Sequence, residues 1–381
     1  MVAQANAARA NAVAMPAALT LHGSRILVGA GLLDACGAEL REALPRRRLA
    51  IISDDTVAPL YAARLRAACD APAPALFTIP AGEPSKTRKQ WSRLTDELLA
   101  AGYGRDSAIL ALGGGVVGDL AGFVAATYLR GIPVVQLPTT LLAMIDAAVG
   151  GKTGVDTKAG KNLVGAFHHP VLVVADPRAL RTLPLAHLRN GLAEAVKHGV
   201  IASPADFVWL ASNVASIARE GGPADEVAER LVRRNIQIKA DVVARDEREN
   251  GVRKILNFGH TIGHALEAAS GFTRTHGECV AIGMVVEARI ARGVGVGDAG
   301  LADAIATVLR DAGLPTAVPS SLPGEAVLAA MRTDKKARGG AVEFALPAKL
   351  GVMAGGEQGW GIPVPDAVVL EALAASRDVD R

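Results

Sequence analysis

Two histidines stand four residues apart in the segment KILNFGHTIGHALE, which has a helical pattern. This spacing puts His260 and His264 on one helical face, so one metal ion could engage one or both imidazoles. The glutamate that follows the first histidine in the helical zinc motif of metalloproteases is absent. Two other segments, NGLAEAVKHGV and THGECVAIGM, supply Glu194 and His276. A glutamate and two histidines form an ordinary zinc site with positions open for substrate oxygens.

Each histidine taken alone is more often a surface or core residue, so the metal prediction depends on the whole set. Cys279 could join His276 as a ligand, but a small buried thiol is the favoured interpretation. Lys197 follows Glu194 by one helical turn and places a cation beside the predicted metal.

A glycine-rich turn follows the strand-like run SAILAL and precedes a helical stretch. Exposed backbone N–H groups at the start of a helix suit a pyrophosphate. The acidic residue expected about twenty positions later in dinucleotide-binding folds is missing, and a simple strand-to-helix turn is the alternative. Asp54, Glu83 and Lys86 could contact a ribose instead, or could be solvated loop charges. The turn offers Gly114, Gly115, Val116, Val117, Gly118 and Asp119.

Basic and amide side chains gather near the same segments. They would suit an anionic substrate, with arginine binding a carboxylate and lysine or asparagine binding phosphate oxygens. Most charged residues are only solvated, but Lys152 lies in the run GGKTG, where a solvated helix face is not available to explain it. The set consists of Lys152, Lys161, Asn162, Lys239, Arg253, Asn257, Lys335 and Lys336.

The elements that must position these residues fall into two groups. From Ile26 to Val174, short β-type runs alternate with helical patterns, which predicts a mostly parallel sheet with helices on its faces. After Pro184 one helical pattern follows another, and one helix is predicted to begin at Ser203 with proline at its first position. Residues 313–325 form a connector, and EFALPAKLGVM predicts a small strand or hairpin.

We therefore predict an α/β nucleotide-binding domain over residues 19–184 and an all-helical metal- and substrate-binding domain over 185–381. Residues 1–18 are predicted to be a flexible extension that lacks the apolar core of a secretory signal. A chain of 381 residues favours two domains with a catalytic cleft between them.

Bulk composition excludes several classes of protein. The formal charge of +3 and an aromatic content of 3% do not indicate a nucleic-acid surface. No uncharged apolar run of about twenty residues is present, so a soluble protein is expected. Three cysteines without paired spacing favour a reducing compartment, and we expect the cytoplasm.

The motifs together resemble the 3-dehydroquinate synthase family within the sugar-phosphate cyclases. The resemblance runs in order from about Ile26 to the C-terminal region, so it is far more specific than any single motif. Small departures are Ala195 and His198, where many relatives have valine and tyrosine, and none affects a ligand or charged position. The motifs are MIDAAVGGKTGVDTKAGKNLVGAFHHP, GLAEAVKHG, DERENGVRKILNFGHTIGHALE, HGECVAIGM and MRTDKK.

The resemblance implies a role for each matching residue. Metal ligands, zinc or cobalt being the metal, fall on Glu194, His260 and His276. NAD contacts fall on Asp54, Glu83, Lys86, Gly114, Gly115, Val116, Val117, Gly118, Asp119, Thr139, Thr140, Lys152, Lys161, Ala179 and Thr182. Substrate and catalytic positions fall on Asp146, Lys152, Asn162, Lys197, Lys239, Glu249, Arg253, Asn257, His264 and one of Lys335 and Lys336. Arg130 would reach the substrate phosphate from the neighbouring subunit of a homodimer.

The implied reaction converts 3-deoxy-D-arabino-heptulosonate 7-phosphate into 3-dehydroquinate and phosphate, in the shikimate pathway of aromatic amino-acid biosynthesis. It proceeds by transient oxidation with NAD, phosphate elimination, re-reduction and aldol closure, which makes the enzyme a lyase. Three alternatives remain: a cyclase acting on sedoheptulose 7-phosphate, a metal-dependent alcohol dehydrogenase of the glycerol dehydrogenase type, and a catalytically inactive relative. Lys239 and Arg253 argue against the first, because two cations beyond the phosphate site imply a substrate carboxylate.

Overall fold

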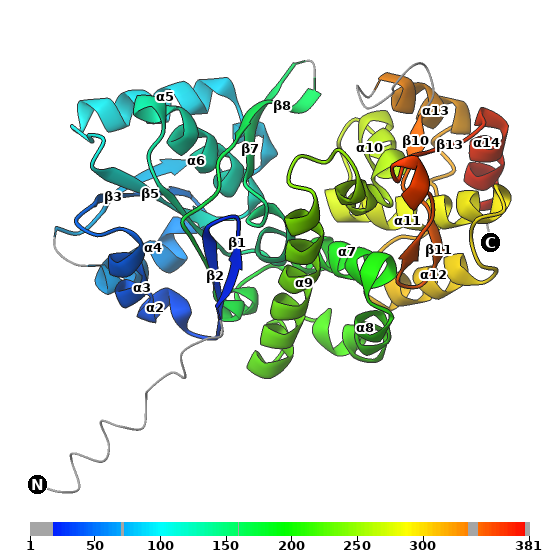
Figure 1. Cartoon of the computed structure of the whole chain (residues 1–381), viewed down its shortest axis with the longest axis horizontal. Coiled ribbons are helices and arrows are strands. Elements are labelled where there is room, and N and C mark those ends of the chain that lie inside the picture. The colour runs from blue at the N-terminus through cyan, green and yellow to red at the C-terminus, as the bar shows by residue number, and fades with distance from the viewer. Residues whose placement is uncertain (1–17, 70–71, 159, 334–341, 378–381) are drawn as a thin grey trace, which may run out of the picture.

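The computed structural model describes residues 18–69, 72–158, 160–333 and 342–377. Figure 1 shows two parts side by side: a sheet flanked by helices, and a group of helices that follows it in the chain. Residues 1–17 of the predicted extension lie outside the described residues. No helix in the described ranges is long and apolar enough to cross a bilayer.

The first part is built on a seven-stranded sheet of the described residues, in the order β1-β2-β9-β6-β5-β3-β4. All neighbouring strands are parallel except β1 and β2. Every residue of β5 is buried, as expected for a central parallel strand covered on both faces. The strands are β1 Leu19–Leu21, β2 Ser24–Val28, β3 Arg48–Asp54, β4 Ala75–Ile79, β5 Ser107–Gly113, β6 Val134–Pro138 and β9 Leu172–Ala175.

Helices cover both faces of this sheet, so the predicted α/β architecture is confirmed. Alternate residues of one strand pack on opposite sides: Ile51 joins the cluster containing α2 and α4, and Ile52 joins the cluster containing α5 and α6. The helices are α2 Leu32–Ala35, α3 Gly37–Ala43, α4 Ala58–Ala68, α5 Arg88–Ala100 and α6 Gly115–Thr127. Short helical turns are η1 Glu83–Ser85, η2 Tyr128–Arg130, η3 Ala143–Ala147 and η4 Pro177–Arg181.

A separate antiparallel hairpin, β7 Lys152–Thr157 and β8 Gly160–Phe167, projects between the two parts (Figure 1). The sequence analysis predicted neither this hairpin nor β4. Alternation is hidden in the hairpin by glycines and charges, and β8 is largely exposed along its length. The glycines are required, because a Cβ on Gly165 would lie 2.1 Å from the Thr153 carbonyl oxygen.

The second part is helical, as predicted. Its helices are α7 Leu185–Ala202, α8 Pro204–Ile217, α9 Asp225–Arg245, α10 His260–Ala269, α11 His276–Gly293, α12 Leu301–Asp311, α13 Gly324–Thr333 and α14 Asp366–Ala375, with the turns η5 Val252–Asn257 and η6 Gly356–Gln358. The predicted start of α8 is confirmed, since the Ser203 side chain accepts a hydrogen bond from the Asp206 N–H. Short antiparallel pairs join β10 Glu343–Phe344 to β13 Ile362–Pro363 and β11 Pro347–Lys349 to β12 Val352–Met353.

Helices α10 and α11 approach each other unusually closely. A Cβ on Gly283 would lie 2.0 Å from the carbonyl oxygen of Gly259, and Gly263 lies against the backbone of Cys279. Gly259 itself has a φ of 79°, which favours glycine. Small residues let the two helix backbones touch, and this contact brings His260 and His276, the first residues of α10 and α11, to the same place.

Replacing Gly283 with alanine should therefore separate α10 from α11. Overpacking of this kind costs about 1–3 kcal/mol, and here the added methyl meets backbone that cannot rotate away. We expect a lower denaturation midpoint for Gly283→Ala than for Gly293→Ala, a matched change on the same helix whose Cβ would meet only the Val368 side chain, at 3.0 Å. Equal midpoints in guanidinium or thermal unfolding would contradict this account of the contact.

Candidate metal and substrate site

The three predicted metal ligands meet where α7, α10 and α11 converge. Glu194, His260 and His276 each offer one ligand atom, and these atoms all lie within 4.8 Å of one another. The Nε2 atoms of His260 and His276 lie 3.4 and 3.5 Å from Oε1 of Glu194. One carboxylate and two imidazoles at these distances suit a divalent transition metal with open positions.

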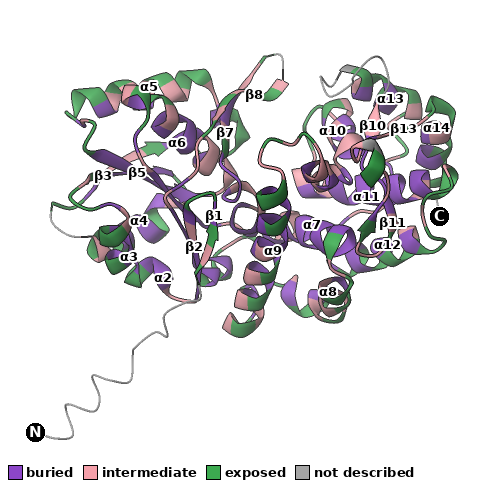
Figure 2. Ribbon diagram, in the orientation of Figure 1, coloured by how far each residue is buried: buried purple, intermediate pink, exposed green. Residues whose placement is uncertain are grey.

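The Glu194 carboxylate is completely buried in α7, the helix that Figure 2 shows as largely purple. Neither carboxylate oxygen accepts a hydrogen bond of good geometry from the described residues. The Lys197 ammonium nevertheless lies against one of them. Burial raises the pKa of Glu194, but Lys197 and then His260 outweigh it and hold that pKa well below its usual range. The site therefore presents a buried, ionised carboxylate to a cation.

The two candidate imidazole ligands differ in charge. Partial burial, followed by repulsion from Lys197, lowers the pKa of His260 to about 4, so this ring is neutral near pH 7. Burial also lowers the pKa of His276, but its contacts with Glu194 and Glu267 outweigh that and raise it to about 9. A metal must displace the His276 proton, so metal affinity should rise with pH.

His264 lies beside the metal ligands without belonging to the trio. Its ring centroid is 5.3 Å from that of His260 and 5.9 Å from that of His276. The predicted shared face of α10 is thus observed. Cys279 is buried in α11 and is not part of the trio, in agreement with its interpretation as a small core thiol.

A second, partly buried ion pair lies near Lys197. Lys239 of α9 donates from Nζ to both the carbonyl oxygen and Oδ1 of Asp146, each at 2.6 Å. Asp146 lies in η3, a π-helical turn of the kind that often marks a functional site. Burial lowers the pKa of Lys239, and the low pKa of Asp146 reflects Lys239 and Lys197 opposing burial.

His198 is a site neighbour for which sequence analysis gave no role. It is fully buried within 4.8 Å of Glu194 and Asp146, measured between possible ligand atoms. Its Nδ1 lies 3.0 Å from Oδ1 of Asn235, whose amide nitrogen donates to the carbonyl oxygen of Leu231. This arrangement fixes the proton on Nδ1, and burial with nearby Lys197 lowers the pKa of His198 to about 4.

A second group of predicted residues forms around Glu249. Its carboxylate ion-pairs with Lys152 of β7 and accepts a hydrogen bond of 2.5 Å from the Asn257 amide. Arg253 is buried nearby, where its guanidinium donates to the backbone carbonyls of Glu247 and Gly150. These contacts therefore join the hairpin region to the segment around turn η5, although the two lie more than ninety positions apart in the chain.

Three predicted site residues have left-handed backbone. The φ angles are 71° at Arg130, 56° at Asn162 and 62° at Glu249. This conformation costs a non-glycine residue about 1–2 kcal/mol, and such strain tends to collect at functional sites. Asn162 also donates its backbone N–H to Asp156 Oδ1 at 2.8 Å, which holds it on the hairpin.

The glycine turn has the predicted strand–turn–helix geometry: β5 ends at Gly113 and α6 begins at Gly115. A Cβ on Gly114 would lie 3.1 Å from Thr140, so the turn is closely packed. Gly118 lies against Gln136. The Val117 side chain is buried in the core, so this residue offers only its backbone to a ligand.

The remaining predicted nucleotide contacts lie around this turn. Lys86 is buried and ion-paired with Asp119 at 2.5 Å. Asp54 ends β3, where its Oδ1 accepts from the N–H groups of Thr56 and Val57. Thr139 has a buried hydroxyl without a hydrogen-bond partner among the described residues. Glu83 is exposed at the start of η1. The Thr140 hydroxyl accepts a hydrogen bond from the Ala143 N–H. The Thr182 hydroxyl contacts the Tyr61 hydroxyl and the Ala179 carbonyl oxygen.

Some predicted residues are not brought to the site. Arg130 is exposed at the end of η2, and no hydrogen bond or ion pair joins it to the site residues that the structure describes. Lys335 and Lys336 lie outside the described residues.

Sequence reasoning missed Glu267, which holds a metal ligand. Its Oε1 lies 2.7 Å from Nδ1 of His276, and its Oε2 lies 3.0 Å from the ammonium of Lys161. A periodicity signal was present, because Glu267 lies three residues after His264 and seven after His260 on the same helix. Tyr61, beside Thr182, had no such signal because it comes from a separate segment.

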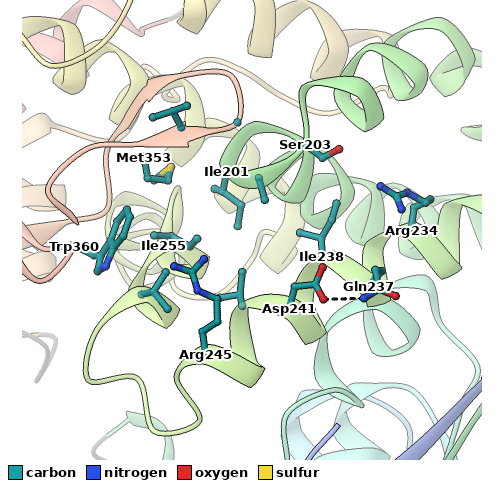
Figure 3. Close-up of a pocket in the computed structure, with 15 residues that line it drawn as sticks. Ile201, Ser203, Arg234, Gln237, Ile238, Asp241, Arg245, Ile255, Met353 and Trp360 are labelled. Atoms are coloured by element: carbon teal, nitrogen blue, oxygen red, sulfur yellow. Dashed lines mark hydrogen bonds between the residues drawn. The ribbon is translucent and has the colours of Figure 1, made fainter. Parts of the chain in front are cut away.

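A cavity of about 430 Å³ lies elsewhere, between the ends of α7 and α9 and the β11–β12 hairpin. Figure 3 shows Trp360, Met353 and Arg245 on its walls and the hydrogen bond from Gln237 to Asp241. It contains none of the predicted site residues.

Comparison with known proteins gives consistent matches. Residues 76–190 match the family model of the 3-dehydroquinate synthase N-terminal region, and residues 191–337 match that of the C-terminal region. A 3-dehydroquinate synthase of Symbiobacterium thermophilum is 50% identical over 330 residues, covering 86% of this chain and 91% of that protein.

Two solved structures have a similar fold. A 2-deoxy-scyllo-inosose synthase complexed with carbaglucose-6-phosphate, NAD+ and Co2+ has a TM-score of 0.83 at 26% identity, covering 94% of this chain and all of that one. A 2-epi-5-epi-valiolone synthase from Streptomyces hygroscopicus with NAD+ and Zn2+ bound also has a TM-score of 0.83, at 30% identity, covering 96% and 99% of the two chains.

Removal of a ligand should affect metal binding more than removal of its neighbour. We expect His276→Ala to raise the dissociation constant for Co2+ by more than about a hundredfold. This is more than the usual effect of changing a residue that only contacts a metal ligand. His264→Ala should change it by less than about tenfold, because His264 lies outside the trio. Equilibrium dialysis with metal analysis measures both, and equal losses would contradict the assignment of ligands.

Proposed function

The chain belongs to the 3-dehydroquinate synthase family, and we propose that it converts 3-deoxy-D-arabino-heptulosonate 7-phosphate into 3-dehydroquinate and inorganic phosphate. In this proposal the enzyme is a carbon–oxygen lyase that uses NAD and a divalent metal. The observation that carries the proposal is the meeting of Glu194, His260 and His276 close to two lysines, Lys197 of α7 and Lys239 of α9, each paired with a carboxylate. A dehydrogenase of simple alcohols would not need the additional cations.

The residues present fit both NAD and a divalent metal ion. Glu194, His260 and His276 supply a buried carboxylate and two imidazoles, a donor set typical of Zn²⁺ or Co²⁺. For NAD, the N–H groups at the start of α6 and the closely packed glycine turn offer a pyrophosphate site. The buried Thr139 hydroxyl, unpartnered among the described residues, is a free polar group beside that turn. When bound, NAD would accept and return a hydride, and the metal would polarise substrate oxygens.

The chain's own residues then have separable tasks. Lys152, Asn162 and Asn257 would hold the phosphate, and Glu249 orients Lys152 and Asn257 for that task. Asp146 orients Lys239. His264 is placed beside the ligands to move a proton at the substrate hydroxyl that is oxidised. Ring closure needs chiefly a fixed substrate conformation, which these contacts would impose.

Recognition of a substrate carboxylate would depend on Arg253. The sequence argument counted both Lys239 and Arg253 as excess cations, but Lys239 has its own carboxylate partner in Asp146. The Arg253 guanidinium donates hydrogen bonds to two backbone carbonyls, which are neutral acceptors and do not neutralise its charge. A carboxylate on the substrate would supply the matching charge.

Turnover tests the proposal directly. With a small amount of NAD, the keto acid phosphate should release many equivalents of phosphate per NAD, and NMR should identify the cyclic product. Chelation should abolish the reaction, and Zn²⁺ or Co²⁺ should restore it. Sedoheptulose 7-phosphate should have a kcat/KM on the order of a hundredfold lower, because it lacks the carboxylate that would bind Arg253.

Two outcomes would redirect the assignment. NADH that accumulates in step with product would indicate a dehydrogenase. Equal use of both phosphorylated substrates would indicate a different cyclase with the same fold and metal site.

We also propose that the protein is a homodimer in which Arg130 acts on the partner's site. Arg130 is exposed, has strained backbone and has no partner among the site residues described. Those features suit a residue that completes its interactions across an interface. The proposal further places residues 19–184 in the nucleotide-binding domain, 185–381 in the metal-binding domain, and the protein in the cytoplasm.

Mixed dimers distinguish action in trans from action in cis. Arg130→Ala and His276→Ala should each inactivate a homodimer. Coexpressed together, they should recover about a quarter of wild-type activity, because about half of random dimers are mixed and each has one intact site. Lack of recovery in purified mixed dimers would mean that Arg130 serves its own subunit or neither.

A further inference from the structure

Glu267 connects two parts of the site that lie far apart in the chain. Its side chain is nearly inaccessible, with 3% of the residue exposed. One oxygen contacts His276 at the start of α11, and the other contacts Lys161 on β8. Because both oxygens are engaged, a change at one partner alters the position available to the other.

The contact with His276 fixes which ring nitrogen faces the metal site. Oε1 of Glu267 lies 2.7 Å from Nδ1 of His276, and an ionised carboxylate can only accept hydrogen bonds. Nδ1 of His276 must therefore carry the proton that it donates. Nε2, which lies 3.5 Å from Glu194, is the atom left to bind a metal.

The contact with Lys161 holds the hairpin against the helical part. The Lys161 ammonium lies 3.0 Å from Glu267 Oε2 and 5.1 Å from the centre of the Phe272 ring, beyond the end of α10. The next residue on β8 is Asn162, which we assign to the substrate phosphate. Strand β8 is exposed along much of its length, so this charged contact is an important constraint on where β8 lies relative to the helical part.

We propose that Glu267 is a positioning residue that couples metal binding to the placement of the β7–β8 hairpin. In this proposal a metal bound to His276 fixes the position of the Glu267 side chain. Glu267 then holds Lys161 in place, which keeps the neighbouring Asn162 at the substrate. Energetic coupling is reciprocal, so loss of the Lys161 contact should also weaken metal binding. This inference rests on the metal-dependent function proposed above.

Metal affinity gives a first test that does not use activity. In metal-depleted protein titrated with Co2+ against a competing chelator, Glu267→Gln should raise the dissociation constant about 10–100-fold. Lys161→Met, a change at a partly exposed residue, should produce a smaller increase, and the double variant should be weaker than wild type by less than the product of the two effects. The matched control is Glu343→Gln, which loses a Glu–Lys pair with Lys254 but contacts no imidazole, and it should bind Co2+ as wild type does.

Hydrogen exchange gives the second test. Loading wild-type protein with Co2+ should slow amide exchange in residues 160–167, and this response should be lost in both Glu267→Gln and Lys161→Met. Wild-type affinity in Glu267→Gln, or an unchanged exchange response in Lys161→Met, would overturn the coupling while leaving the proposed function intact. Failure of the wild-type protein to bind Co2+ would overturn both.

Discussion

The site depends on one constraint, the burial of the Glu194 carboxylate. An ionised carboxylate without contact with water costs several kcal/mol unless cations and donors surround it. Lys197 comes from the same helix, but His260 and His276 begin two other helices, so α7, α10 and α11 must converge on one point. The contact between Gly283 and Gly259 lets two of them approach closely enough. Compensation of the Glu194 charge and the glycine packing therefore both require α7, α10 and α11 to converge at this point.

Four other lysines of the site already have carboxylate partners. Lys86, Lys152, Lys161 and Lys239 pair with Asp119, Glu249, Glu267 and Asp146 respectively. An anionic substrate therefore exchanges one anion for another at each lysine and does not meet bare charge. Such pairs hold each lysine in place before binding, which lowers the entropy lost when the substrate arrives. They also make recognition depend on geometry as well as on net charge.

The sequence predicted the parallel sheet, the glycine turn, the helical second half and the metal trio. The elements follow from local pattern, as in the buried run of β5, whereas the metal trio follows from the whole set of motifs, because a single histidine has several more common roles. It did not predict the β7–β8 hairpin, whose glycines are explained only by the close pairing of its strands, in which a Cβ on Gly165 would lie 2.1 Å from the Thr153 carbonyl oxygen. It also gave no role to Glu267 or His198, because their partners are set by tertiary packing. Residue type alone does not show which carboxylate will meet which lysine.

The distribution of apolar contacts indicates where the site can move at least cost. One core cluster continues from the sheet into the helical part and includes Leu137 and Leu141 with Leu192 and Val196. Helix α7 lies so close to the segment before η3 that a Cβ on Gly191 would be 2.6 Å from the Leu141 side chain. Separation of the two parts would expose this core at about 25 cal/mol for each Å². Strand β8 is largely exposed, and charged contacts such as those of Lys152 and Lys161 join the hairpin to the helical part, whereas the buried Val155 anchors β7 on the sheet side. Adjustment to a substrate therefore costs least in β8, where polar contacts can exchange with water, and most at α7, which keeps the metal ligands fixed.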